Sequence, residues 1–298
     1  MWRLSFALCL AWPAVGVAQA GSIPGRDLLA FPLALTAEPA ALGTQAGTGL
    51  WNPATAVLPA GARWRLSATA MSAPTDVTVA AQVGAVAGVW RRTTLAFTVA
   101  RAAVSGLLRT DSDPQVLGDD IAYSTLVVSA VAARRFTPHL LAGFALRVRN
   151  GRLDDLSRTG LALDAGVVAE HLGPLDSRVG VSSFLLSPAA GSRERTSVLA
   201  AADTRVAGAD SARTVRAGYA LEHTAGLSTE EFIFASARWG RWEARGGPVR
   251  TTIFGASNWR ARFGIAVRHA SYVVGIAREE SVNGLAPTYY FSLTSVVR

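Results

Sequence analysis

The sequence contains 298 residues, half of them hydrophobic, and carries a formal net charge of +8 at neutral pH. Its 29 basic residues are all arginines, scattered along the chain without a basic run, so a nucleic-acid partner is not expected. No uninterrupted apolar stretch reaches the ~20 residues that a membrane-spanning helix needs, so the hydrophobic content does not indicate a helical membrane protein.

Residues 1–20 have the organisation of a secretory signal peptide. Arg3 supplies a positive start, an apolar stretch follows, and Ala18-Gln19-Ala20 forms a small-x-small cleavage site. We expect cleavage before Gly21, which leaves about 278 residues, enough for one large domain. The only cysteine, Cys9, lies inside this segment, so the mature chain should contain neither disulfides nor thiolate metal sites.

Residues 21–61, which we call the leader, are rich in Gly, Ala and Pro and show no convincing strand or helix pattern. Near its end lies Asn52-Pro53-Ala54. Pro53 fixes its own φ and keeps Asn52 extended, and the short Asn52 side chain can bond to amides just downstream. By itself this pattern indicates a surface turn before a strand. Next to the long strand series that follows it, the same turn could instead be the hinge between the leader and those strands.

From about residue 62 to the C-terminus, apolar and polar residues alternate with the period of a half-buried strand. The segment at 242–249, interrupted by Gly246, Gly247 and Pro248, is the least regular. Most segments have the ~9–11 residues that a tilted strand needs to cross a bilayer. The fourteen segments are 62–71, 77–90, 93–104, 120–133, 140–148, 161–171, 178–186, 197–205, 214–223, 231–239, 242–249, 258–268, 271–278 and 288–297.

The connections between these segments alternate in length. Longer polar ones are expected at 107–119, 149–160, 188–195 and 279–287, and tight ones at 91–92, 240–241 and 269–270. An even strand number, this asymmetry and apolar-out/polar-in strands are typical of an outer-membrane β-barrel. We therefore predict an all-β fold, a transmembrane antiparallel β-barrel of about 14 strands over residues 62–298, in the outer membrane and in contact with its lipid. A large soluble β-sandwich is the alternative.

The same alternation assigns the two faces of the predicted wall. Bulky apolar side chains should face lipid, and charged ones on the opposite face should line the lumen. The side chains expected toward lipid are Trp64, Leu66, Phe263, Ile265 and Val267. The arginines expected in the lumen are Arg63, Arg65, Arg260 and Arg262.

A barrel of fourteen strands has a lumen wider than side chains alone can fill. Eight strands give a filled interior and sixteen or more an aqueous channel. The leader is of a size to fold inside as a plug, with Asn52-Pro53-Ala54 as the hinge where the plug becomes wall. The arginines expected in the lumen would then donate to leader carbonyls.

The chain resembles the FadL superfamily of outer-membrane transporters, and within it the PorV/PorQ-type proteins. The resemblance rests on the leader motifs, the strand series and the C-terminal hairpin with its terminal strand. It implies a non-enzymatic component of protein secretion or cell-surface attachment, with secretion-system proteins as partners. The alternative is a FadL-like channel for hydrophobic small molecules. The residues that carry the resemblance are Ala41-Leu42-Gly43, Leu50-Trp51-Asn52-Pro53-Ala54, 258–278, Asn283-Gly284-Leu285 and Tyr290-Phe291-Ser292-Leu293.

No pattern in the sequence indicates an enzyme. The histidines His139, His171, His223 and His269 lie at predicted strand ends or turns, and no pair has metal-ligand spacing. No G-x-S-x-G nucleophile motif is present. We therefore predict no catalytic residues, no metal and no cofactor.

Overall fold

The structure is a computed structural model. It describes residues 22–29, 37–44, 49–74, 77–110, 116–187, 194–210, 213–253, 255–280 and 287–298. The predicted signal peptide, with its cleavage site and Cys9, lies outside the described residues.

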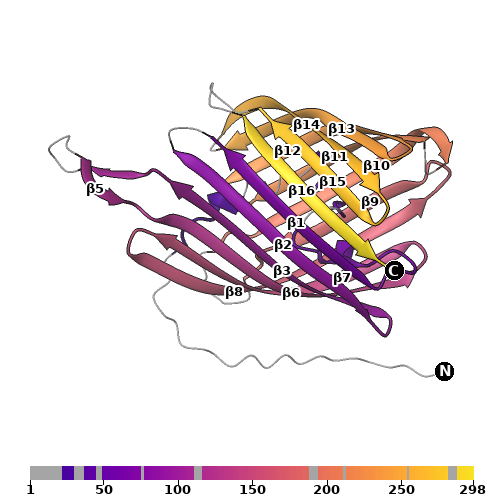
Figure 1. Ribbon diagram of the computed structural model, residues 1–298, viewed down its shortest axis with the longest axis horizontal. Helices are drawn as coiled ribbons and strands as arrows, with labels where there is room; N and C mark the ends of the chain where they lie inside the picture. Colours follow the sequence, from indigo (N-terminus) through magenta and orange to yellow (C-terminus); the bar gives the residue numbers. More distant parts are fainter. Residues whose placement is uncertain are drawn as a thin grey trace.

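Fourteen antiparallel strands close into a barrel in which neighbours along the chain are neighbours in the wall (Figure 1). The first strand pairs with the last, β3 pairs directly with β6, and a separate hairpin of β4 and β5 extends from the connection between β3 and β6. The prediction of about 14 strands is confirmed. The strand bounds are β1 Trp64–Ala73, β2 Thr78–Trp90, β3 Thr93–Ser105, β4 Leu108–Thr110, β5 Val116–Asp120, β6 Tyr123–Thr137, β7 Leu140–Leu153, β8 Leu156–Leu172, β9 Ser177–Phe184, β10 Ser197–Asp210, β11 Arg213–Thr224, β12 Ser228–Trp239, β13 Trp242–Ile253, β14 Ala256–His269, β15 Tyr272–Glu279 and β16 Thr288–Val297.

The outer face of the barrel is apolar. Large hydrophobic side chains there are strongly exposed, for example Leu66 at 50%, Phe144 at 68% and Ile265 at 57%, while their sequence neighbours are buried. Exposing so much contiguous apolar surface to water would be unfavourable, and lipid removes that cost. The outward face of a closed barrel therefore places the protein in the outer membrane. Of the side chains expected toward lipid, Val267 is half-buried and the other four are exposed.

The two ends of the barrel differ. At the short-turn end the strands are joined by turns of two to four residues, and β1 begins and β16 ends there. The opposite end, which we call the long-loop end, carries the β4–β5 hairpin and the longer connections (Figure 1). This asymmetry agrees with the connection lengths expected at 107–119 and 279–287.

The expected loop at 149–160 is wrong. There β7 and β8 continue into a tight turn, because polar side chains pair across the strands: Asn150 Nδ2 donates to Ser157 Oγ at 3.1 Å and to Thr159 Oγ1 at 2.9 Å. Beyond the apolar band both faces of the sheet are polar, so apolar/polar alternation no longer marks the strand. The hairpin of β4 and β5, which overlaps the expected loop at 107–119, was also not predicted.

The irregular segment at 242–249 is a complete strand, β13. Pro248 has no N–H to donate, and the ladder between β12 and β13 is interrupted opposite Pro248 and Gly247. Pairing resumes on both sides in the same register, so the wall stays closed.

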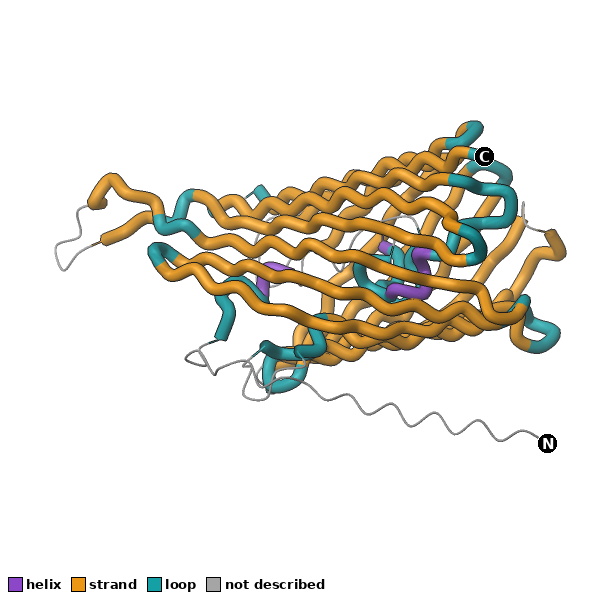
Figure 2. Tube along the Cα trace, turned by 90° about the horizontal axis from the view of Figure 1, so that it is seen from below, coloured by secondary structure: helices purple, strands orange, loops and turns teal. Residues whose placement is uncertain are grey.

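Inside the tube of strands lie two short 3-10 turns of the leader, η1 (Asp27–Leu29) and η3 (Pro53–Ala56) (Figure 2). Among the described residues, no helix is long and apolar enough to cross a membrane. These two leader segments therefore share the interior with the inward side chains of the wall.

Candidate functional site

The first described part of the leader lies at the long-loop end of the lumen. Arg149 of β7 donates to the carbonyl oxygens of Pro24, at 2.7 Å, and of Ile23, at 2.9 Å. Arg149 is almost fully buried and forms an ion pair with Glu194 at 2.6 Å. One wall arginine thus satisfies two backbone carbonyls of the leader, which would otherwise be costly to bury.

Both polar atoms of the Asn52 side chain are hydrogen-bonded. The side chain is fully buried, and its Oδ1 accepts a hydrogen bond from the Ala54 amide at 3.0 Å, which caps η3. Its Nδ2 donates to the carbonyl oxygens of Ala41, at 2.7 Å, and of Val167 on β8, at 3.3 Å. The expected bond to a downstream amide is present, and the side chain in addition joins two leader segments to the wall.

Two wall glycines allow this close approach. A Cβ at Gly166 of β8 would lie 2.0 Å from Asn52 Oδ1, and one at Gly180 of β9 would lie 2.4 Å from the Ala41 carbonyl oxygen. Any larger side chain at either position would have to displace the leader. These glycines therefore form the surface on which the Asn52 contact is built.

Replacing Gly166 by alanine is expected to push Asn52 away and to break its bonds to Ala41 and Val167, at a cost of roughly 1–3 kcal/mol. The control is Gly84→Ala on β2, where nothing lies within 4 Å of the new Cβ. Protease cleavage of the leader and the temperature of heat-induced gel-mobility change should shift for Gly166→Ala alone. Equal behaviour of the two variants would mean that the Asn52 contact holds nothing in place.

An aromatic and apolar layer lies beside Asn52. Ser182 of β9 donates to the Trp51 carbonyl oxygen at 3.0 Å, and the Trp51 and Phe184 rings lie 4.9 Å apart. Leu42 and Leu50 are buried in the same cluster as residues of β8, β9 and β10. The leader is thus packed against the wall through side chains as well as through its carbonyls.

The four arginines expected in the lumen lie in different surroundings. Arg65 is buried and donates to the carbonyl oxygens of Thr44, at 3.4 Å, and of Thr55, at 3.3 Å. Arg63 is exposed, directly before β1 at the short-turn end. Arg65 thus contacts the leader inside the lumen, whereas Arg63 is exposed at the short-turn end.

The expectation that Arg260 and Arg262 donate to leader carbonyls is wrong. Both guanidinium groups pair with the same two carboxylates, those of Glu230 on β12 and Glu279 on β15; the Arg262 contacts are both 2.7 Å. Carboxylates are stronger acceptors than carbonyls, so both guanidinium groups bind these two wall carboxylates instead of leader carbonyls. The result is an ion-pair cluster inside the wall.

A second buried ion pair lies between β7 and β8. Arg147 and Asp164 both have fully buried side chains and are bonded to each other. Arg147 also donates to Ser129 Oγ at 2.8 Å and stacks over Phe184, with the guanidinium carbon 5.0 Å from the ring centroid. Neither this pair nor Arg149 was predicted from the sequence. Charges at inward positions of the predicted strands 140–148 and 161–171 could have identified Arg147 and Asp164, whereas Arg149 fell in the expected loop at 149–160.

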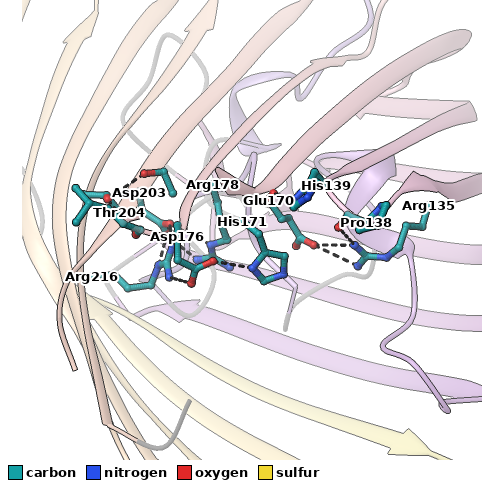
Figure 3. Close-up of polar contacts among 12 residues, drawn as sticks. Arg135, Pro138, His139, Glu170, His171, Asp176, Arg178, Asp203, Thr204 and Arg216 are labelled. Atoms are coloured by element: carbon teal, nitrogen blue, oxygen red, sulfur yellow. Dashed lines mark hydrogen bonds and ion pairs between the residues drawn. The ribbon is translucent and has the colours of Figure 1, made fainter. Parts of the chain in front are cut away.

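A chain of polar contacts lines the wall near the short-turn end (Figure 3). His171 Nδ1 lies 2.6 Å from Asp176 Oδ1, and Arg216 contacts Asp176 at 3.0 Å and Asp203 at 2.8 Å. Burial would raise the pKa of the Asp176 carboxyl, but hydrogen bonds from His171 and Arg216 outweigh it and hold the pKa below its ordinary value. Asp176 therefore keeps its negative charge, and its hold on Arg216, at neutral pH.

His139 and His171, expected as separate strand-end residues, come together at this end. Their rings are 6.4 Å apart, and His139 Nδ1 lies 3.1 Å from the Glu170 carbonyl oxygen. Among the described residues, no group of three or more His, Cys, Asp or Glu side chains is placed to hold a metal ion.

Two of the spaces between the leader and the wall are small crevices. A crevice of about 20 Å³ separates residues 39–41 from β10, β11, β12 and β14, and another of about 40 Å³ lies between Leu42, residues 54–57 and strands β6 to β9. For comparison, an apolar cavity that binds benzene has a volume of about 150 Å³. In this conformation neither crevice admits even a small aromatic molecule.

Comparisons with known proteins support the fold. The sequence matches no protein-family model and no curated protein. The structure is similar to that of the monoaromatic hydrocarbon channel CymD, with a TM-score of 0.65 at 11% identity, over 93% of this chain and 98% of that one. It is also similar to the toluene transporter TodX of Pseudomonas putida, with a TM-score of 0.55 at 11% identity, over 88% of this chain and 96% of that one. The toluene transporter TbuX of Ralstonia pickettii has a TM-score of 0.53 at 12% identity, over 90% of this chain and 98% of that one. The chain therefore shares the barrel fold of these three proteins.

Proposed function

We propose that the protein is a channel for hydrophobic or amphipathic small molecules across the outer membrane, and that the leader is its plug. The observation that carries the proposal is the occupied lumen: leader carbonyls are bound by Arg65 and Arg149 of the wall, and Asn52 ties the leader to β8. Passage of a ligand then requires the leader to move.

The fold comparisons favour this transport function over the secretion or attachment role that the PorV/PorQ resemblance implied. The three similar structures are named as transporters or channels for toluene or monoaromatic hydrocarbons. None of them is a secretion component. We therefore propose apolar molecules of that size as the first ligands to test, and no catalytic step.

A reversible cross-link between leader and wall tests the proposal. A Cβ at Gly25 would lie 3.1 Å from the Thr125 Cβ of β6, so Gly25→Cys/Thr125→Cys can form a disulfide after a small backbone shift. The mature chain contributes no competing thiol. Uptake of labelled toluene by cells with an intact outer membrane should rise with the full-length protein, fall when the cysteine pair is oxidised, and return on reduction.

Uptake equal to that of cells without the protein would overturn the channel function. Stoichiometric co-purification of outer-membrane secretion proteins in the same experiment would then support the secretion role. Uptake that the disulfide leaves unchanged would keep the channel but reject movement of this part of the leader.

A further inference from the structure

A polar cavity of about 310 Å³ opens inside the barrel at the short-turn end. It lies beneath the leader, which contributes Glu38 and Thr44 to its lining, and its other walls are inward side chains of β8 to β14 and of the β8–β9 turn. Six arginines line it against four carboxylates: Arg178, Arg205, Arg216, Arg238, Arg245 and Arg268 against Glu38, Glu170, Asp176 and Glu243. The lining is therefore net positive.

Part of this charge is concentrated in one line across the wall. Arg205 of β10 is paired in register with Arg216 of β11, Arg216 with Ser236 of β12, and Ser236 with Arg245 of β13. We call these four residues the basic row. Like charges directly opposite each other in a sheet are destabilising. The arrangement is thus unfavourable unless negative groups offset it.

Protein carboxylates offset only part of the row. Arg216 is bound by Asp203 and Asp176, and Arg245 contacts Glu243 at 2.6 Å and Glu38 at 3.4 Å. No described residue pairs with the guanidinium of Arg205 or with the hydroxyl of Ser236. The row therefore has spare hydrogen-bond donors that face the cavity.

We propose that this cavity binds the carboxylate group of an organic acid, with Arg205 as the principal cation. The same cavity shows how its arginines receive a carboxylate: Glu243 accepts from Arg238 at 2.9 Å, Arg245 at 2.6 Å and Arg268 at 3.3 Å. Guanidinium groups suit planar carboxylates because they donate two parallel hydrogen bonds. A ligand carboxylate would accept hydrogen bonds from the Arg205 guanidinium, as the Asp203 and Glu243 carboxylates do from the arginines that they bind.

Two sources of the carboxylate are consistent with the cavity size, which is near the lower end of the roughly 300–1,000 Å³ of ligand sites. One is a small acid from the aqueous phase. The other is the head group of an amphipathic acid that passes through the lumen, an option that rests on the proposed channel function. The carboxylate chemistry is shared, and the length of the apolar tail separates the two.

Binding to the purified full-length protein in detergent micelles tests the site by titration calorimetry, with micelles alone subtracted. The probes are propionate, octanoate and neutral 1-octanol. We expect saturable binding of at least one acid, and a loss of roughly tenfold or more for Arg205→Gln, because a charge-assisted bond is removed. Tighter binding of octanoate than of propionate would identify the amphipathic source, and equal binding the small acid.

The matched control is Arg241→Gln, which removes the same charge from an exposed turn residue at the same end of the barrel, outside the cavity lining. The guanidinium of Arg205 has no described partner, so its replacement should leave the fold intact, as heat-modifiable gel mobility would show. The site is rejected if neither acid binds, if 1-octanol binds as tightly as octanoate, or if the two variants weaken binding equally. Toluene uptake is a separate measurement, so loss of this site would not by itself reject the channel.

Discussion

A chain that lacks residues 21–54 is expected to form the same barrel and to conduct ions, whereas the full-length chain should stay nearly closed. The wall strands satisfy one another's backbone hydrogen bonds, so the barrel does not need the leader to close. A barrel of fourteen strands leaves an interior wider than its own side chains fill. Wall arginines that lose leader carbonyls, such as Arg149, would then be hydrated in the open lumen, so no large desolvation penalty should remain.

Planar-bilayer conductance measures the effect, with heat-modifiable mobility as the check on folding. Removal of residues 21–29 alone is the matched control. Asn52, with its bond to β8, and η3 remain in the lumen of this variant, so its conductance should rise little. A folded chain without residues 21–54 that conducts no more than the parent would falsify the plug. Failure of that chain to fold would instead make the leader a part of the barrel core.

The barrel itself was predictable from the sequence because one physical property marks every strand. Outward residues meet lipid and inward residues meet a polar lumen, so alternation persists wherever a strand lies within the membrane. The same reason explains the errors at 149–160 and 107–119. There the sequence is polar at successive positions, so the period of two disappears from the hydropathy pattern although the backbone ladder continues.

The partners of the lumen side chains were not predictable in the same way. A strand pattern gives the face of Arg262 but not the register of its neighbours, and it is the register that brings Glu230 and Glu279 to this side chain. The basic row likewise follows from three successive strand registers. Each register depends on turn length and on backbone irregularities such as the shift after Arg205, which alternation does not report.

Asn52 illustrates an intermediate case. Its bond to the Ala54 amide follows from local chemistry, since Asn before Pro commonly caps a turn. Its bonds to Ala41 and Val167 depend on the glycines opposite it in the wall. Glycine inside a strand does indicate a close approach of another backbone, but the sequence does not say which segment approaches.

Replacing Arg147 by methionine is expected to destabilise the barrel by roughly 3–5 kcal/mol, because it leaves the Asp164 carboxylate buried without its cation. Both side chains are fully buried, so water cannot take the place of the guanidinium unless the packing around Phe184 opens. Denaturant unfolding in lipid vesicles, followed by tryptophan fluorescence, measures the loss.

Two further variants separate the buried charge from other effects of the substitution. Arg109→Met removes an ion pair whose side chains are 41% and 39% exposed, that between Arg109 and Asp154, and should cost at most about 1 kcal/mol. Arg147→Met/Asp164→Asn removes both charges of the buried pair but keeps an acceptor for the Leu186 amide, which now donates to Asp164 at 2.9 Å. This double variant should recover most of the stability, since the penalty arises from an unpaired charge rather than from the lost contact. If it is as unstable as Arg147→Met, the guanidinium acts mainly through its stacking on Phe184 and its bond to Ser129.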